Sequence, residues 1–262
     1  MAGTIRVTVF GSSAGFPTEK RTNTCIGIWR SDRELYLIDS GEPTAAYLAR
    51  RRVSPDTLRA VFITHPHADH CGGLPMLMQW HQLNHRRRPL TVLLPREIVV
   101  PLRDFLNAIY LLPELLGFDL ELRPISTGRV YSDGLDVEAI PNTHIAGSAE
   151  HARAAGYPAL GDSFSFRVRV DGKTLLFSGD LASPDEIVGA VDGVDLAVVE
   201  MAHFTPEALG AALAATKLPR LVATHIIHTL EPVEEGIADR IRSAGFGGEI
   251  HVAKDGDEFE VW

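Results

Sequence analysis

A short polar stretch follows an apolar one in this chain: Thr64-His65-Pro66-His67-Ala68-Asp69-His70. Three histidines and an aspartate fall within six residues, directly after a strand predicted over 60–64. Strand ends are where α/β folds place their sites, and imidazole and carboxylate groups are ligands for zinc, manganese and iron. His65 and His67 alternate along an extended turn and can point the same way, whereas Asp69 and His70 begin a new direction. One loop can therefore serve two metal ions.

Outward from this loop, short apolar segments alternate with helical ones, which is typical of an α/β protein. Strands are predicted over residues 5–10, 25–29, 35–38, 60–64, 91–94, 120–123, 135–140, 163–170, 174–178, 195–200 and 221–224. Helices are predicted over residues 43–52, 74–83, 97–112, 206–215 and 233–243, and a final strand pair is predicted around 250–262. No linker separates the two βα-rich halves, about 1–120 and 121–262, so we expect one domain over 1–262.

The composition is typical of a globular protein. Of the 262 residues, 45% are hydrophobic and 23% charged, which suffices for a core without disulfides. No stretch approaches the ~18 uncharged apolar residues of a membrane span, and the N-terminus lacks a signal-peptide pattern. Cys25 and Cys71 are too few for a disulfide framework. We therefore expect a cytoplasmic protein with reduced thiols and no membrane partner.

The net charge of −9 argues against a broad nucleic-acid footprint, which needs clustered Lys and Arg. The basic runs 50–52 and 86–88 each follow a predicted helix, where cations suit the C-terminal dipole. We expect solvated helix ends, with phosphate contacts as the alternative.

Three further polar residues each follow a later predicted strand. His144 comes after 135–140, Asp180 after 174–178 and His225 after 221–224. Alone each is a weak signal, but together with the H-x-H-x-D-H loop the set resembles the metallo-β-lactamase superfamily. That resemblance implies a four-layer αββα sandwich, with the metals at one edge between the two sheets.

The resemblance also implies the ligands of two divalent metal ions. The first ion would be held by His65, His67 and His144, and the second by Asp69, His70 and His225. Asp180 would bridge the two metals, together with a shared hydroxide that attacks the substrate. Zinc is the first choice, with manganese and iron as alternatives. Asp39 matches the family's early aspartate and would orient a ligand loop, although it could equally be a turn residue before Gly41.

The opening of the chain resembles the tRNase Z branch of this superfamily, which begins with a strand, a Gly-rich turn, Pro-Thr and an Asn beside a hydroxyl residue. The corresponding residues are Phe10-Gly11-Ser12-Ser13-Ala14-Gly15-Phe16-Pro17-Thr18 and Asn23-Thr24. Glu200 and His203 resemble the branch's proton-donating pair, in which the carboxylate keeps the imidazole charged. The implied catalytic residues are therefore Asp69, Glu200 and His203. The alternative is a strand-end Glu beside a helix N-terminal His, and the segment between them is shorter than usual for the branch.

One departure concerns the protruding arm with which the tRNA-processing enzymes hold tRNA, commonly between the positions of His144 and Asp180. Only 35 residues, 145–179, lie between them here, and they contain no basic Gly- and Pro-rich arm. We therefore expect an arm-less phosphodiesterase for a small phosphodiester or nucleotide-type substrate, and do not expect tRNA as a partner. The alternatives are a tRNA 3′-processing endoribonuclease, a lactone or carboxylic-ester hydrolase, and a non-catalytic metal-binding scaffold; a homodimer is compatible with each.

The remaining histidines carry weaker arguments. His81 and His85 are four residues apart on a predicted helix, so we expect them on one polar face, with a metal pair as the alternative. His228 follows His225 by three residues and lines either the pocket or a loop. The sequence assigns no role to His151 or His251.

Overall fold

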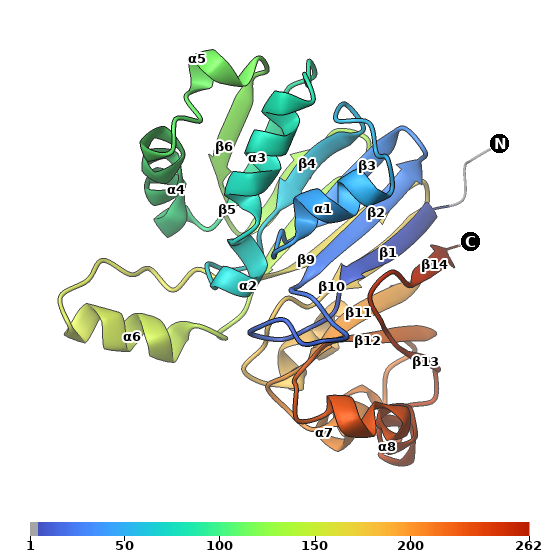
Figure 1. Cartoon of the computed structure of the whole chain (residues 1–262). Helices are drawn as coiled ribbons and strands as arrows, with labels where there is room; N and C mark the ends of the chain where they lie inside the picture. Colours follow the sequence, from blue (N-terminus) through green and yellow to red (C-terminus); the bar gives the residue numbers. More distant parts are fainter. Residues whose placement is uncertain (1–4, 262) are drawn as a thin grey trace.

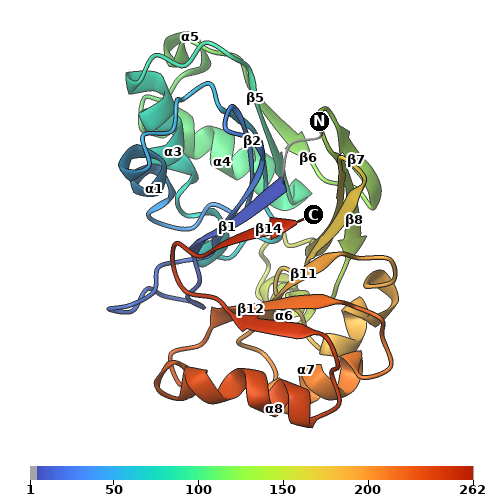
Figure 2. The same ribbon diagram turned by 90° about the vertical axis from the view of Figure 1, so that its right-hand side faces the viewer.

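Two mixed β-sheets face each other in the computed structural model, which describes residues 5–261 (Figures 1 and 2). The first sheet has the order β14 (Glu258–Val261), β1 (Ile5–Gly11), β2 (Cys25–Ser31), β3 (Glu34–Ile38), β4 (Leu58–Phe62), β5 (Leu90–Leu94), β6 (Leu120–Pro124). The second has the order β13 (Glu249–Val252), β12 (Arg220–Ile226), β11 (Leu196–Met201), β10 (Lys173–Phe177), β9 (Phe164–Val170), β8 (Asp136–Pro141), β7 (Gly128–Ser132). The predicted αββα sandwich is confirmed.

The central strands are buried on both faces, which explains their continuous apolar sequences. Along β3, Tyr36 and Ile38 face the opposite sheet, whereas Leu35 and Leu37 face the helices outside. This alternation follows from the two-residue period of a strand. Between the sheets, the rings of Phe62 and Phe166 lie with centroids 5.9 Å apart. One apolar layer therefore holds the sheets together and a second layer binds the helices.

Helices cover both outer faces (Figures 1 and 2). On the first sheet lie α1 (Thr44–Arg50), α3 (Leu74–Leu83), α4 (Arg96–Ala108) and α5 (Pro113–Leu116). On the second lie η1 (Pro184–Ala190), α7 (Pro206–Leu213) and α8 (Ile237–Ser243). Among the residues that the structure describes, every helix is too short or too polar to cross a membrane.

Several elements differ from the sequence prediction. The helix predicted over 97–112 ends at Ala108, because the backbone turns through a left-handed Tyr110 (φ 63°) before α5 begins. The helix predicted over 233–243 is formed only as α8 from Ile237 onward; the preceding residues lie in η2 (Glu231–Gly236), where Val233 is not helical. Five short elements were not predicted: α2 (Ala68–Cys71), α5, β7, α6 (Ala146–Ala154) and η1. The predicted hairpin at 171–172 is confirmed between β9 and β10.

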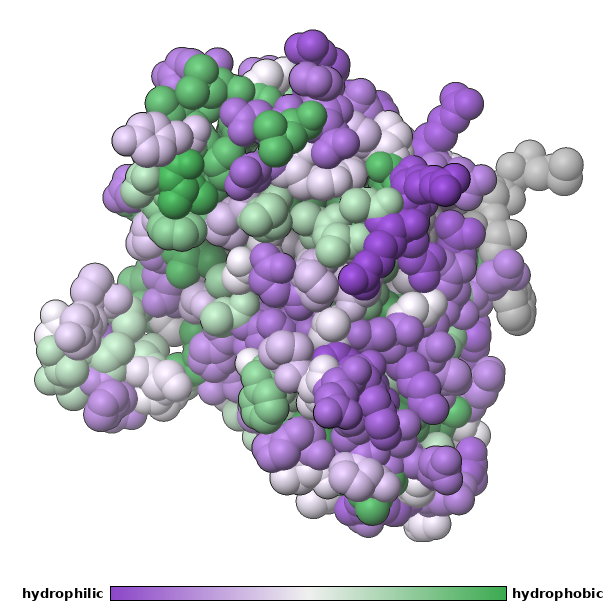
Figure 3. Space-filling view, viewed as in Figure 1, coloured by the Kyte–Doolittle hydropathy of each residue, from purple (hydrophilic) through white to green (hydrophobic). Residues whose placement is uncertain are grey.

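Exposed apolar side chains gather over α4 and α5, at the upper left of Figure 3. They include Val100, Phe105, Ile109, Tyr110 and Leu115. This surface is on the helical layer of the first sheet.

The expected polar face of His81 and His85 is wrong. His81 is fully buried in α3, with its ring 4.9 Å from that of Trp80 and 6.0 Å from that of Phe118 (centroid distances). His85 lies beyond the end of α3 in a left-handed conformation, with φ 57°. The two imidazoles therefore share neither a helix face nor a metal.

The run 86–88 is also not simply a solvated helix end, because Arg86 is fully buried. Its guanidinium donates to backbone carbonyl oxygens, those of Pro55, Leu58, Arg88 and Pro89. It therefore fastens the end of α3 to the start of β4.

His81 should make the fold sensitive to acid. Burial, with a contribution from nearby Arg86, lowers its pKa to about 3, whereas an unfolded histidine titrates near pH ~6.5. Because only the unfolded chain takes up this proton, the stabilisation is complete above about pH 6.5 and is lost as pH falls toward 3. Between about pH 6.5 and 5, the free energy of unfolding of the wild-type protein should therefore fall by roughly 1.5 kcal/mol more than that of His81→Leu. Urea denaturation at each pH measures this difference.

The exposed His151 provides the matched control, since His151→Gln should leave that pH dependence as in the wild-type protein. Equal pH slopes for His81→Leu and the wild type would show that His81 does not titrate differently on folding.

Candidate metal centre

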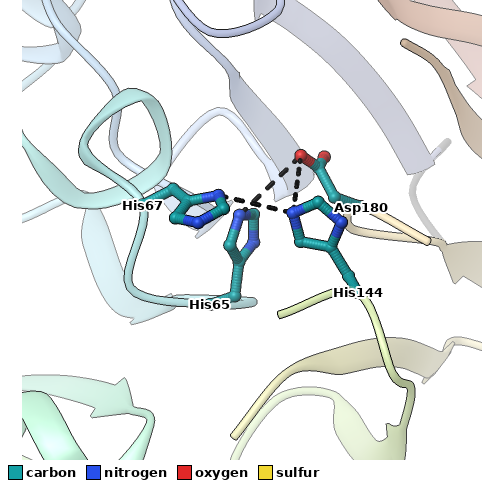
Figure 4. A group of neighbouring side chains, drawn as sticks. All are labelled: His65, His67, His144 and Asp180. Atoms are coloured by element: carbon teal, nitrogen blue, oxygen red, sulfur yellow. Dashed lines mark hydrogen bonds and ion pairs between the residues drawn. The ribbon is translucent and has the colours of Figure 1, made fainter. Parts of the chain in front are cut away.

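Strands of both sheets end at one edge of the sandwich, and the predicted ligands meet there. Two groups have ligand atoms that all lie within 4.8 Å of one another, a four-residue group and a three-residue group: His65, His67, His144 and Asp180; Asp69, His70 and His225. Figure 4 shows the first group, in which His65 and His67 from one loop face His144 and Asp180 from other segments of the chain. The loop after β4 contributes to both groups. All seven residues in the predicted ligand set are therefore neighbours in space.

Asp180 belongs to the first group and also lies beside two histidines of the second group, His70 and His225. Its Oδ1 lies 3.3 Å from Nε2 of His70, and its Oδ2 lies 3.2 Å from Nε2 of His225. The same Oδ2 is 3.7 Å from Nε2 of His65 and 3.6 Å from Nε2 of His144. One carboxylate thus faces imidazoles of both groups, which is the position that a bridging ligand requires.

The position of the Asp180 carboxylate depends on close packing between backbone segments at two glycines. Gly179, just before Asp180, has a φ of 57°, and a Cβ there would lie 2.9 Å from the Cβ of Thr64. Gly41 approaches the ligand loop still more closely, since a Cβ would lie 2.2 Å from the carbonyl oxygen of Asp69. Only glycine fits these two positions without displacing the loop that carries the ligands.

Two site residues hold a backbone conformation that is uncommon outside glycine. Asp39 has a φ of 62° directly after β3, and His225 has a φ of 53°. His225 is also the extra residue of a bulge, because Glu200 pairs with Thr224 and Met201 pairs with Ile226. Such positions cost of order 1–3 kcal/mol and cluster at functional sites. Here the bulge turns the imidazole out of the strand and toward Asp180.

A second layer of polar groups fixes the orientation of the histidines. The carboxylate of Asp39 lies 2.8 Å from Nδ1 of His70 and accepts a hydrogen bond from the backbone N–H of Thr64. The hydroxyl of Thr24 lies 2.6 Å from Nδ1 of His225. Each contact engages Nδ1 and leaves Nε2 directed at Asp180, as outer partners of metal-bound histidines do. Sequence reasoning singled out Asp39 but missed Thr24 and Thr64 as orienting groups; Thr24 was visible only as part of the Asn23-Thr24 motif.

The charge states suit cation binding. Burial lowers the pKa of His65 and His67, and lowers that of His144 to about 4, which favours the neutral imidazole that a metal ion requires. Burial opposes ionisation of Asp180, but His225 and His70 outweigh it and hold the pKa of this carboxyl well below its usual range. Burial likewise disfavours the charged form of His70, yet the carboxylates of Asp180 and Asp39 raise its pKa.

Several of these polar atoms are buried without a hydrogen-bond partner: Nε2 of His65, Nε2 of His70 and Oδ1 of Asp180. Leaving such groups unsatisfied costs about 1–3 kcal/mol each, and a cation would satisfy them.

Burial raises the pKa of the Cys71 thiol to about 11, and the thiol donates to the carbonyl oxygen of Pro66. The donor set is therefore nitrogen and carboxylate oxygen, which fits a divalent cation such as zinc.

Glu200 and His203 lie beside this cluster. The carboxylate of Glu200 is buried, and it accepts hydrogen bonds from the backbone N–H groups of Leu181, Ala202 and His203. Its Oε1 also lies 2.9 Å from Nδ1 of His203. This contact raises the pKa of His203. The Nδ1 of the ring lies 3.9 Å from Oδ2 of Asp180, so His203 lies at the edge of the metal-ligand cluster.

The sandwich fold and the His/Asp cluster at its edge define a metal-dependent hydrolase. The family model for the beta-lactamase superfamily domain matches residues 35–226, and the chain belongs to that superfamily. Within it, the chain lies in the tRNase Z-like branch, as the following relatives show.

The Ribonuclease Z of Natronomonas pharaonis is 27% identical over 312 aligned residues, which cover 98% of both chains. The crystal structure of human tRNase Z, short form, superposes with a TM-score of 0.73 at 22% identity, covering 98% of this chain and 99% of that one. A diphosphatase from the PhnP family superposes with a TM-score of 0.74 at 17% identity, covering 98% and 97%.

Asp39 should contribute to metal affinity although it is not one of the predicted ligands. Asp39→Ala removes the carboxylate at Nδ1 of His70, and loss of such a partner typically lowers metal affinity about 10- to 100-fold. Competition with a metal chelator measures this change. Asp104→Ala, on the exposed side of α4, is the control and should leave affinity unchanged. Wild-type affinity in Asp39→Ala would contradict the assigned role.

Proposed function

We propose that the chain is a phosphodiesterase that holds two divalent metal ions, with zinc as the first choice. His65, His67, His144 and Asp180 would hold one ion, and Asp69, His70 and His225 the other, with Asp180 bridging to it through its contacts with His70 and His225. The observation that carries the reaction class is the Glu200–His203 pair beside Asp180, because it supplies a proton donor next to the cations. A site that only stored metal would gain nothing from such a pair.

Each part of the site has a chemical task in this proposal. When bound, two divalent cations lower the pKa of a water molecule to about 7 and neutralise the charge that develops on phosphoryl oxygens. Glu200 accepts from Nδ1 of His203 and leaves Nε2 free to donate a proton to the departing oxygen. The backbone hydrogen bonds to Glu200 hold this carboxylate in place beside His203.

A second candidate function is tRNA 3′-end processing. A relative that aligns over 98% of both chains is a Ribonuclease Z. This similarity does not support the expectation that tRNA is not a partner. The helix α6 and the loop after it also extend from the body in Figure 1, at the position where tRNA-processing enzymes carry their arm. Within α6, one arginine is balanced by one glutamate. We rank a smaller substrate first, because this excursion offers little positive charge to an RNA backbone.

We expect bis-p-nitrophenyl phosphate to be hydrolysed faster than p-nitrophenyl phosphate by the metal-replete protein. The monoester carries an additional negative charge, and none of the described residues that line the pocket beside the cluster is Lys or Arg. Initial rates with both esters and with a lactone test this order. Preference for the lactone would favour a carboxylic-ester hydrolase, and efficient cleavage of precursor tRNA at low enzyme concentration would favour the second candidate.

His203→Ala should separate proton donation from metal binding. General acid catalysis contributes about 10²–10⁴-fold, so kcat should fall by roughly that factor for a diester with a poor leaving group. The loss should be much smaller for p-nitrophenolate, which departs without a proton. Metal content should remain that of the wild type, and Glu200→Gln should reduce the rate less than His203→Ala.

His151→Ala serves as the matched histidine control, because this side chain is exposed on α6. Wild-type rates in His203→Ala for both kinds of leaving group would contradict the role assigned to this residue, while the metal site itself would stand.

A further inference from the structure

An aromatic pair lines the pocket beside the metal cluster. The pocket has a volume of about 240 Å³, and its wall includes Asp69, Asp180 and His203 together with Phe16 and His228. The rings of Phe16 and His228 have centroids 5.1 Å apart and planes tilted by 39°. The Phe16 side chain is 52% exposed and is not part of the core, whereas phenylalanine is usually buried.

The loop that carries Phe16 is fastened to the strand end that carries His228. The backbone N–H of Ile226 donates to the carbonyl oxygen of Ser12 at 2.7 Å. In return, the N–H of Ala14 donates to the carbonyl oxygen of Ile226 at 3.3 Å. Beyond the rings, the hydroxyl of Thr18 donates to the carboxylate of Glu231 at 2.7 Å. The two loops are therefore joined on both sides of the aromatic pair.

The same loop is joined to the metal cluster. The backbone N–H of Gly15, the residue before Phe16, donates to Oδ2 of the predicted ligand Asp69 at 2.8 Å. The hydroxyl of Ser13 donates to the carbonyl oxygen of Phe16 at 2.6 Å. An exposed ring is thus held at a fixed place next to the reacting centre, as preorganised binding groups are.

The chemistry of the pocket wall favours an aromatic ligand group over a charged one. Apart from the predicted metal ligands and His203, the wall consists of Ala14, Gly15, Phe16, Ala202, Ile227 and His228. No lysine or arginine is among these described residues, so ion pairing does not select the part of the substrate that lies here. Flat apolar and imidazole surfaces bind a π-face well, and nucleobases present such faces.

We propose that Phe16 and His228 form a stacking platform for a nucleobase joined to the scissile phosphate, so that the substrate is a nucleotide-type phosphodiester. This inference rests on the proposed phosphodiesterase function and names its substrate class. The phosphate lies at the metal cluster and the base lies against the Phe16 ring. Specificity then comes from stacking, which accepts different bases because each has a π-face.

Binding of two monophosphates to the metal-replete protein tests this proposal independently of turnover. Adenosine 5′-monophosphate and ribose 5-phosphate share the sugar and the phosphate and differ in the base. We expect the nucleotide to bind about 5- to 150-fold more tightly by titration calorimetry, as base stacking on one aromatic ring provides. Phe16→Ala should remove most of this difference, Phe16→Trp should keep it, and His228→Ala should reduce it.

Phe105→Ala is the matched control, because Phe105 is 50% exposed on α4, outside the pocket, and this variant should keep the full difference. Equal affinity of the wild-type protein for the two monophosphates, no binding of either, or an unchanged difference in Phe16→Ala would each overturn the platform. Turnover of simple diesters tests the proposed function separately. If the wild-type protein prefers the nucleotide but does not hydrolyse diesters, the phosphodiesterase proposal is contradicted and the platform stands.

Discussion

The rest of the structure depends on one buried carboxylate, that of Asp180, which lies within 3.7 Å of imidazole nitrogens from four different histidines. A charge in such a place is costly unless opposite charge and hydrogen bonds compensate it. The left-handed backbones of Asp39 and His225 and the close contact at Gly179 all serve to bring groups to this point. The two apolar layers of the sandwich provide the rigidity that keeps these conformations in place.

The chemistry of the site follows from how its environment divides the histidines. Burial favours the neutral forms of His65 and His144, which suit cation binding, whereas a hydrogen bond to Glu200 favours the charged form of His203. Candidate metal ligands and the proposed proton donor are therefore residues of the same type that lie side by side in different environments. The aromatic pair that lines the pocket would extend this arrangement from the phosphate to the group attached to it.

The sequence allowed the fold class and most strands to be predicted, because apolar runs of strand length and polar strand ends depend on local patterns. The neighbourhood of the seven ligand candidates was equally predictable, since each candidate follows a strand and strand ends share an edge. His81 and Arg86 were misjudged, because their burial depends on packing by distant residues such as Phe118 and Pro55. The bulge at His225 and the hydroxyl of Thr24 beside it arise from pairing across the sheet, which no local pattern reports.

Metal stoichiometry tests the central role of Asp180 most directly. Elemental analysis of protein saturated with zinc and freed of excess metal should give about two ions per chain for the wild type and for the surface control Asp104→Ala. Asp180→Ala should retain one ion or fewer, because it removes the proposed bridging ligand, which faces histidines of both groups, and the negative charge between two like cations. Two ions retained in folded Asp180→Ala, or none in the wild type, would contradict the account.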